Sequence, residues 1–183
     1  NMRLSIGYDA RMSSIPIVEK LSQGLKDSGA EVLILGLVTT PVCYFSTFQL
    51  DLDGAIMVTG SHNPPEYNGF KVSLGKTTIF GEEIQTLKAI MQSENFVSGS
   101  GSIKNYDIFP EYLARYKKEF GPIGPIKVVL DCGNGAGGSI VRKLFNTTGL
   151  DPEILFEKPD ATFPNHHPDQ TVEENLKDLK KKV

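Results

Sequence analysis

The chain has 183 residues, of which 39% are hydrophobic and 22% charged, and its formal net charge is −3. This length fits one large domain or two small ones, and the charge balance gives no basic face of the kind that binds nucleic acid. The apolar runs have the length of strands, so no membrane-spanning helix is expected. Cys43 and Cys132 are too far apart in the sequence to form a disulfide framework, so we expect two reduced cysteines in a cytoplasmic protein.

Strands and helices are predicted to alternate over the first 120 residues. Ser13 and Ser14 are candidate N-caps for the first helix, Pro16 is tolerated in its first turn, and Gly29 is expected to end it. A turn at Asn68-Gly69 is expected to make one strand antiparallel to the strand before it. The predicted strands lie at 2–8, 31–37, 55–58 and 70–74, and the predicted helices at 13–29, 41–48, 81–92 and 106–120.

The segment 121–125, Gly-Pro-Ile-Gly-Pro, is the best candidate for a linker, because its prolines and glycines disfavour both helix and central strand. After it the alternation restarts, with strands at 126–130 and 152–156, a helix at 137–147, an irregular loop at 161–170 and a capping box at 171–174 before a last helix. We therefore predict an α/β fold with two domains, 1–121 and 122–183. The first has a mixed, mostly parallel sheet flanked by helices, and the second has a similar architecture.

The second predicted domain has about sixty residues and two clear strands, which is small for an independent core. No glycine follows the last helix, and the helical pattern continues to residue 183. We therefore expect the sequence to be a fragment in which the second domain is incomplete.

The stretch 53–74 carries the strongest functional signal. A buried strand is expected to end at Thr59-Gly60 and to present Ser61, His62 and Asn63 in a turn that two prolines stiffen. A serine just past a strand, outside any hydrogen-bonded ladder, is well placed to act as a nucleophile. By itself the Ser-His pair indicates a polar turn, since adjacent side chains do not readily form a dyad and no G-x-S-x-G elbow is present.

The segment TGSHNPPEYNGFK, residues 59–71, closely resembles the active-site serine segment of the α-D-phosphohexomutases, the phosphomannomutase/phosphoglucomutase family. Three further segments resemble the same family in the same order. They are GYDAR with two serines at 7–14, VVLDCGNGAGG at 128–138 and FPNHHPDQTVEENL at 163–176. The resemblance extends over nearly the whole chain.

This resemblance implies that Ser61 carries the transferable phosphate, with His62, Lys71 and Arg11 as catalytic residues around it and Thr59 and Asn63 as support for the loop. His62 and Lys71 would serve in acid/base work or charge stabilisation, and the fork of Arg11 would contact the phosphoserine, because a guanidinium matches phosphate geometry. Hexose 6-phosphate and hexose 1-phosphate of mannose or glucose would be interconverted through hexose 1,6-bisphosphate. The expected partners are therefore small hexose phosphates, with neither nucleic acid nor membrane.

The same resemblance implies one Mg²⁺, held by the phosphate on Ser61 and by an aspartate-rich loop, Asp-Gly-Asp-Gly-Asp-Arg, which these 183 residues do not contain. We therefore expect that the chain alone does not turn over. The pair Asp51 and Asp53 stands before a buried strand and is interpreted as part of a turn.

Two other patterns compete with this interpretation. Gly133, Gly135 and Gly138 match G-x-G-x-x-G between a predicted strand and helix, with Glu157 at the end of the next strand. That pattern allows an oxidoreductase that binds a dinucleotide of the NAD type, whereas the family resemblance makes it a structural unit.

A non-catalytic module that binds sugar phosphates is a further alternative. His166-His167 could suggest a metal site, but adjacent residues in an extended loop point in opposite directions, which favours a structural loop.

Overall fold

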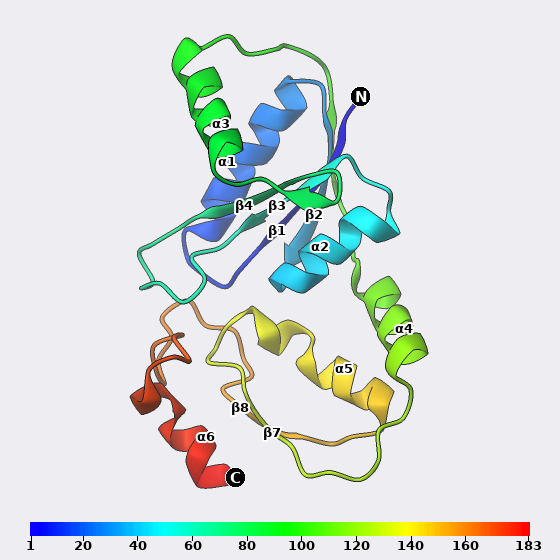
Figure 1. Cartoon of the computed structure of the whole chain (residues 1–183), viewed down its shortest axis with the longest axis vertical. Helices are drawn as coiled ribbons and strands as arrows, with labels where there is room; N and C mark the ends of the chain where they lie inside the picture. The colour runs from blue at the N-terminus through cyan, green and yellow to red at the C-terminus, as the bar shows by residue number, and fades with distance from the viewer.

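Six strands form a mixed sheet in the computed structural model, which describes residues 1–183 (Figure 1). Their order across the sheet is β5-β4-β3-β1-β2-β6; β3, β1, β2 and β6 are parallel, and β4 and β5 are antiparallel to their neighbours. The predicted mixed, mostly parallel sheet is confirmed. The bounds are β1 (Arg3–Tyr8), β2 (Glu31–Leu37), β3 (Gly54–Val58), β4 (Phe70–Leu74), β5 (Thr77–Thr78) and β6 (Ser102–Asn105).

Helices cover both faces of this sheet, because side chains alternate along each strand. Ile56 and Val58 of β3 point to the face covered by α1 (Ser14–Asp27), where they join a core with Leu4, Ile6 and Val32. Ala55 and Met57 point to the opposite face, where they pack with residues of α2 (Thr40–Gln49) and α4 (Phe109–Phe120). All five residues of β3 are buried, as expected for a strand covered on both faces.

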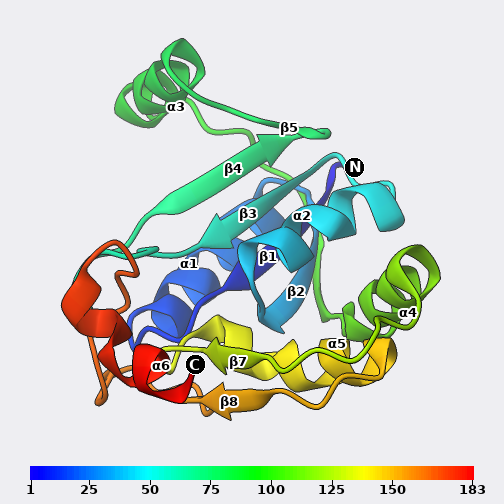
Figure 2. The ribbon, with the colours of Figure 1, turned by 60° about the horizontal axis from the view of Figure 1, so that its bottom comes forward.

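The second unit, which extends from β7 to α6, lies beyond the ends of the parallel strands (Figures 1 and 2). Two short parallel strands, β7 (Val129–Asp131) and β8 (Glu153–Leu155), pair with each other. Its other elements are the 3-10 turn η1 (Ala136–Ser139), α5 (Val141–Thr148), the 3-10 turn η2 (Glu173–Leu176) and α6 (Lys177–Lys182). The cluster around α2 and α4 includes Ile140 as a buried member, and Leu144 of α5 packs against it, so one hydrophobic core joins the two units.

Several local predictions are wrong. The segment 68–69 forms no turn; the loop turns earlier, where the Tyr67 N–H donates to the Pro64 carbonyl oxygen at 3.0 Å. The capping box does not form, because the Thr171 hydroxyl and N–H both donate to Asp169, and Val172 is the N-cap instead. The predicted helix at 137–147 is divided at Ile140 into η1 and α5, and β6 was not predicted.

Helix α3 (Glu82–Ser93) forms close to its predicted position but buries none of its residues. Its apolar residues are 41–68% exposed at Ile84, Leu87, Ile90 and Met91. No helix of the structure combines the length and the apolar character needed to cross a bilayer.

Candidate active site

The polar residues of the site follow three parallel strands at the points where these strands end. Asp9 comes directly after β1, Thr39 and Thr40 follow β2, and Thr59 follows β3. Carboxyl ends of parallel strands lie at the same edge of a sheet, which is where α/β folds bind their ligands. The topology therefore gathers segments that are up to fifty residues apart in the sequence.

Asp9 connects the first of these segments to the third. One carboxylate oxygen accepts hydrogen bonds from the Ser14 hydroxyl at 2.7 Å and the Arg11 N–H at 3.2 Å. The other accepts from the Thr59 hydroxyl at 2.8 Å, the Gly60 N–H at 3.1 Å and Arg11 Nε at 3.1 Å. Five donors on one carboxylate fix the start of the serine loop, residues 59–69, against the end of β1.

Arg11 holds the same loop from inside, and its side chain is only 1% exposed. Its terminal nitrogens donate to four backbone carbonyl oxygens, those of Ser61, Asn63, Pro64 and Tyr67. Nε donates to Asp9, so every nitrogen of the guanidinium group has a hydrogen-bond partner at the end of β1 or in the serine loop. The structure differs here from the expectation that Arg11 contacts a phosphate on Ser61, because its donors point to carbonyl oxygens rather than toward the hydroxyl.

Ser61 itself is exposed on the serine loop that Asp9 and Arg11 hold in place. Its backbone has φ +54°, a left-handed conformation that is uncommon for residues other than glycine and that is often found at functional sites. The Ser61 N–H donates to the Thr59 hydroxyl oxygen at 2.9 Å, and Ser61 Oγ lies 3.4 Å from His62 Nδ1. The hydroxyl is therefore free to meet a ligand while its backbone is held in place.

Asn63 and Lys71 differ in what they contact. Asn63 Nδ2 donates to the Gly60 carbonyl oxygen at 2.9 Å, which closes the turn that contains Ser61. Lys71 lies on β4 directly opposite Met57, and its ammonium group makes no hydrogen bond or ion pair. Met57 lines the cleft described below. Since directly opposite side chains share a face of the sheet, Lys71 lies on the same face as Met57.

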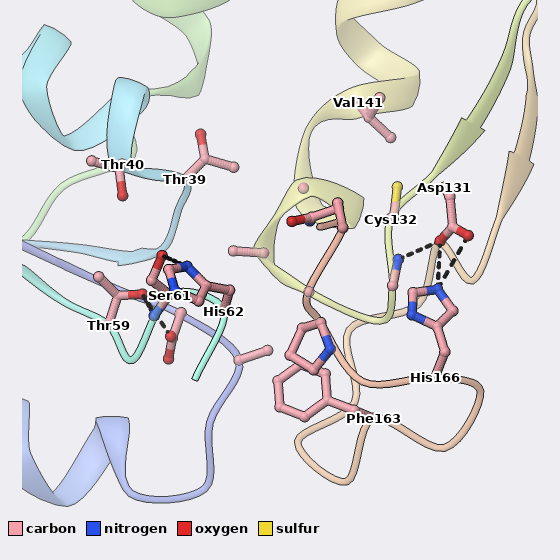
Figure 3. A pocket seen from close by; sticks show the side chains of 18 of the residues that line it. Thr39, Thr40, Thr59, Ser61, His62, Asp131, Cys132, Val141, Phe163 and His166 are labelled. Atoms are coloured by element: carbon pink, nitrogen blue, oxygen red, sulfur yellow. Dashed lines mark hydrogen bonds and ion pairs between the residues drawn. The ribbon is translucent and has the colours of Figure 1, made fainter. Parts of the chain in front are cut away.

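A cleft of about 470 Å³ separates the serine loop from the second unit. Figure 3 shows Ser61, His62 and Thr59 on one wall and Asp131, Cys132 and His166 on the other, with Phe163 between them. The glycine-rich segment 133–137 also lines the second wall. The two predicted domains thus meet at one cavity, and Ser61 lies at its edge.

His166 stabilises the second wall of the cleft through both ring nitrogens. Its Nε2 lies 3.1 and 3.2 Å from the two carboxylate oxygens of Asp131, and its Nδ1 lies 2.9 Å from the His167 carbonyl oxygen. Both ring nitrogens are therefore occupied by the loop itself, and His167 is exposed. The interpretation of this pair as a structural loop agrees with these contacts.

The residues present do not fit a magnesium site by themselves. The carboxylates in the cleft are Asp9, with its five donors, and Asp131, which is bound to His166 and to the Gly133 N–H at 2.8 Å. Mg²⁺ requires free, well-placed oxygen ligands, and no group of three or more acidic, histidine or cysteine side chains in the chain is arranged to hold a metal ion.

The glycine-rich segment packs against protein where a dinucleotide would need space. A Cβ at Gly138 would lie 1.6 Å from the Glu157 carbonyl oxygen. The Glu157 carboxylate is paired with Arg142 at 2.6–3.2 Å, and this hydrogen bonding lowers the pKa of Glu157. It is therefore not a free acceptor for a ribose hydroxyl. These contacts make the G-x-G-x-x-G match a structural unit, and the oxidoreductase alternative is not favoured.

A pair of glycine variants tests this conclusion. Gly138→Ala forces its Cβ into the Glu157 carbonyl, so we expect it to lower the free energy of unfolding by about 2–3 kcal/mol. Gly137→Ala is the matched control, because a Cβ there meets no atom within 4 Å, and a change within about 0.5 kcal/mol is expected. Urea denaturation measures both, and equal effects at the two positions would contradict the packing role.

Cys132 lies in the same cleft but is not a competing nucleophile. Burial raises its thiol pKa to about 11, and the nearby carboxylates of Glu157 and Asp131 act in the same direction. Thiolate is the reactive form, so at pH 7.5 we expect alkylation by iodoacetamide about a few hundredfold slower than for an unperturbed cysteine. Labelling followed by mass spectrometry checks this, and rapid modification at pH 7.5 would show the assignment to be wrong. Cys43, in the core, has its pKa raised to about 12 by burial.

An exposed serine on a rigid loop, at the carboxyl edge of a mixed α/β sheet and facing a cleft, places this chain among the α/β proteins that bind ligands beyond the carboxyl ends of their strands. Sequence models of the phosphoglucomutase/phosphomannomutase family match residues 1–98, as α/β/α domain I, and residues 109–183, as α/β/α domain II. The chain belongs to this family. The boundary at residues 121–122 stays a prediction.

Known proteins agree with this assignment. The chain is 42% identical over 180 residues to a phosphomannomutase/phosphoglucomutase from Pseudomonas aeruginosa and 42% identical over 179 residues to a phosphoglucomutase from Neisseria gonorrhoeae. A crystal structure of a phosphoglucomutase/phosphomannomutase family protein from Burkholderia thailandensis superposes with a TM-score of 0.94 at 38% identity. It covers 100% of this chain. The chain spans 39% of the length of each of the two curated relatives and 42% of the crystallised chain.

Asp9 is the site residue that the sequence interpretation missed. It lies within the segment GYDAR, but the sequence alone indicates no role for it. A carboxylate directly after a buried strand, two residues before an arginine, is the available signal. Its five donors come from two segments, 11–14 and 59–60, so only the fold identifies it as the centre of the network.

Proposed function

We propose that the protein to which this chain belongs is a phosphohexomutase, an isomerase that moves a phosphoryl group between the 6- and 1-positions of a hexose. The observation that carries the proposal is Ser61, which stands exposed at φ +54° on a loop whose backbone Asp9 and Arg11 hold fixed. A nucleophile in a covalent mechanism needs this combination of access and rigidity. Family membership supports the same assignment.

In the proposed reaction Ser61 begins as a phosphoserine. A hydroxyl of the bound hexose phosphate attacks the phosphorus, the bond from phosphorus to Ser61 Oγ breaks, and hexose 1,6-bisphosphate forms. The bisphosphate then reorients in the cleft so that its other phosphate faces Ser61. Ser61 Oγ attacks that phosphate, which restores the phosphoserine and releases the product. Two direct displacements replace one awkward migration.

Nearby side chains would serve this transfer in different ways. The phosphate carries a charge of about −1.5 to −2, and Lys71, whose ammonium group has no partner in the chain, is the cation free to balance it. His62, with Nδ1 3.4 Å from Ser61 Oγ, is placed to exchange a proton with the reacting oxygens. Arg11 would act through the loop backbone rather than on the phosphate.

Magnesium would be shared with parts of the protein outside these 183 residues. The phosphate on Ser61 would supply one oxygen ligand, and carboxylates not contained in this chain would supply the others. When bound, the ion would neutralise charge on the transferring group. Hexose 1,6-bisphosphate would serve as intermediate and activator.

The proposed substrates are small hexose phosphates. Relatives named as acting on mannose, glucose and glucosamine phosphates all match this chain, with a probable phosphoglucosamine mutase from Methanosphaera stadtmanae 34% identical over 192 residues. Two unpaired cysteines fit a reducing compartment, which supports a cytoplasmic location.

The test uses the full-length protein, because the cleft of this chain holds no complete metal site. Intact mass spectrometry is expected to show one phosphoryl group, mapped by peptide analysis to Ser61. With Mg²⁺ and hexose 1,6-bisphosphate supplied, interconversion of hexose 1-phosphate and 6-phosphate is expected. Sugar-phosphate binding with neither phosphorylation nor turnover would identify a non-catalytic binding module instead.

A further inference from the structure

Phe163, in the second unit, lies over the guanidinium of Arg11. The Arg11 Cζ atom lies 5.7 Å from the centroid of the Phe163 ring, within the range of a cation–π interaction. Every hydrogen-bond partner of that guanidinium lies between residues 9 and 67, in the first unit. Phe163 therefore touches the group that holds the Ser61 carbonyl at 2.8 Å.

The backbone of Phe163 has an unfavourable conformation at this position. Its φ is +47°, in a region where a bulky side chain is a genuine outlier. The Phe163 N–H donates to the Asp160 carbonyl oxygen at 3.1 Å, and the Thr162 N–H and hydroxyl donate to the Asp160 carboxylate at 2.9 and 2.7 Å. Strain of this kind persists where the surroundings fix it, and it often marks a functional position.

The loop that carries Phe163 is anchored to the second wall of the cleft. The buried Asn134 accepts from the Asp160 N–H at 2.9 Å, donates to the Lys158 carbonyl oxygen at 2.8 Å and accepts from Asn165 Nδ2 at 2.7 Å. The bond from His166 to Asp131 fixes the far end of the loop. These hydrogen bonds tie the loop that carries Phe163 to the second unit at Asn134 and Asp131.

We propose that Phe163 is a positioning residue that couples the second unit to the Ser61 loop through the Arg11 guanidinium. The inference deepens the proposed function and rests on it, because the group that it positions is the proposed phosphoryl carrier. When the second unit is seated, the ring confines the guanidinium, and the guanidinium fixes the Ser61 carbonyl. Ser61 is then aligned only when both walls of the cleft are in place.

The experiment compares ring-free and ring-retaining variants of the full-length protein. In Phe163→Leu we expect kcat to fall about tenfold with KM within about twofold, because alignment is lost while sugar binding is kept. Phe163→Tyr keeps an aromatic face and is expected to restore kcat to within about twofold. If Phe163→Leu lowers Tm, Phe163→Met is the second ring-free variant.

Lys143→Met is the matched control. Lys143 Nζ lies 5.5 Å from the Phe109 ring centroid, so this pair also joins α5 to α4 by a cation–π contact, but neither residue lines the cleft or contacts the Ser61 loop. We expect its kcat to stay within about twofold of the wild type. An equal loss in Lys143→Met and Phe163→Leu would overturn the proposal, since the effect would then be general to the interface.

Amide hydrogen exchange gives a readout that does not depend on mutase activity. Exchange at residues 60–63 is expected to be about tenfold faster in Phe163→Leu and unchanged in Phe163→Tyr and Lys143→Met. Unchanged exchange together with unchanged kcat in the ring-free variants would overturn the coupling and leave the proposed function intact. If the wild type carries no phosphate on Ser61, the proposed function fails, and the exchange result still decides whether Phe163 positions the loop.

Discussion

Ser61→Ala in the full-length protein is expected to lower mutase kcat at least about a thousandfold and to abolish phosphorylation. Removal of the nucleophile in a covalent mechanism takes away both transfer steps, and what remains is binding without chemistry. The serine loop should keep its fold, because Arg11 binds the carbonyl oxygen of residue 61 and Thr59 accepts from its N–H, neither of which involves the side chain. Steady-state kinetics and intact mass measure the two outcomes.

Ser93→Ala is the matched control for this substitution. Ser93 is also exposed, and its hydroxyl donates to the Ile90 carbonyl oxygen at the end of α3, away from the cleft. We expect unchanged kcat and unchanged phosphorylation. Near-normal turnover in Ser61→Ala, or phosphate that stays on the protein after this substitution, would contradict the proposed mechanism.

Arg11→Met is expected to lower the free energy of unfolding by about 3–5 kcal/mol. The substitution leaves four backbone carbonyl oxygens of the serine loop without their donor and removes a cation from contact with the carboxylate of Asp9. Arg11→Lys keeps the charge but lacks the planar fork, so about 2 kcal/mol should still be lost. Urea unfolding gives these values.

Arg115→Met provides the comparison for a surface arginine. Arg115 pairs with Glu119 at 2.8 Å on the outer side of α4, and its side chain is 59% exposed, so a loss below about 1 kcal/mol is expected. If Arg11→Met unfolds no more easily than Arg115→Met, Arg11 is not the organiser of the loop. A direct contact with phosphate would then become the better account of its role.

The sequence by itself determined the family, the alternation of strands and helices, and the position of the proposed nucleophile. These features depend on local signals. Apolar residues at 55–58 bounded by a polar, proline-stiffened turn specify a buried strand that ends in an exposed segment, whatever lies around it. The mostly parallel sheet follows from the strand–helix alternation, and the four segments in family order identify their parent.

The tertiary structure alone decided which polar groups meet. Arg11 resembled a phosphate ligand in sequence, but its five donors are turned inward, because four carbonyl oxygens of the loop 50 to 56 residues away lie within reach. Phe163 contacts Arg11, although the two residues are distant in the chain. Gly138 packs against the Glu157 backbone, which belongs to a separate element. Hydrogen bonds and packing of this kind depend on distances of a few ångströms, and chain order does not fix such distances until the fold has closed.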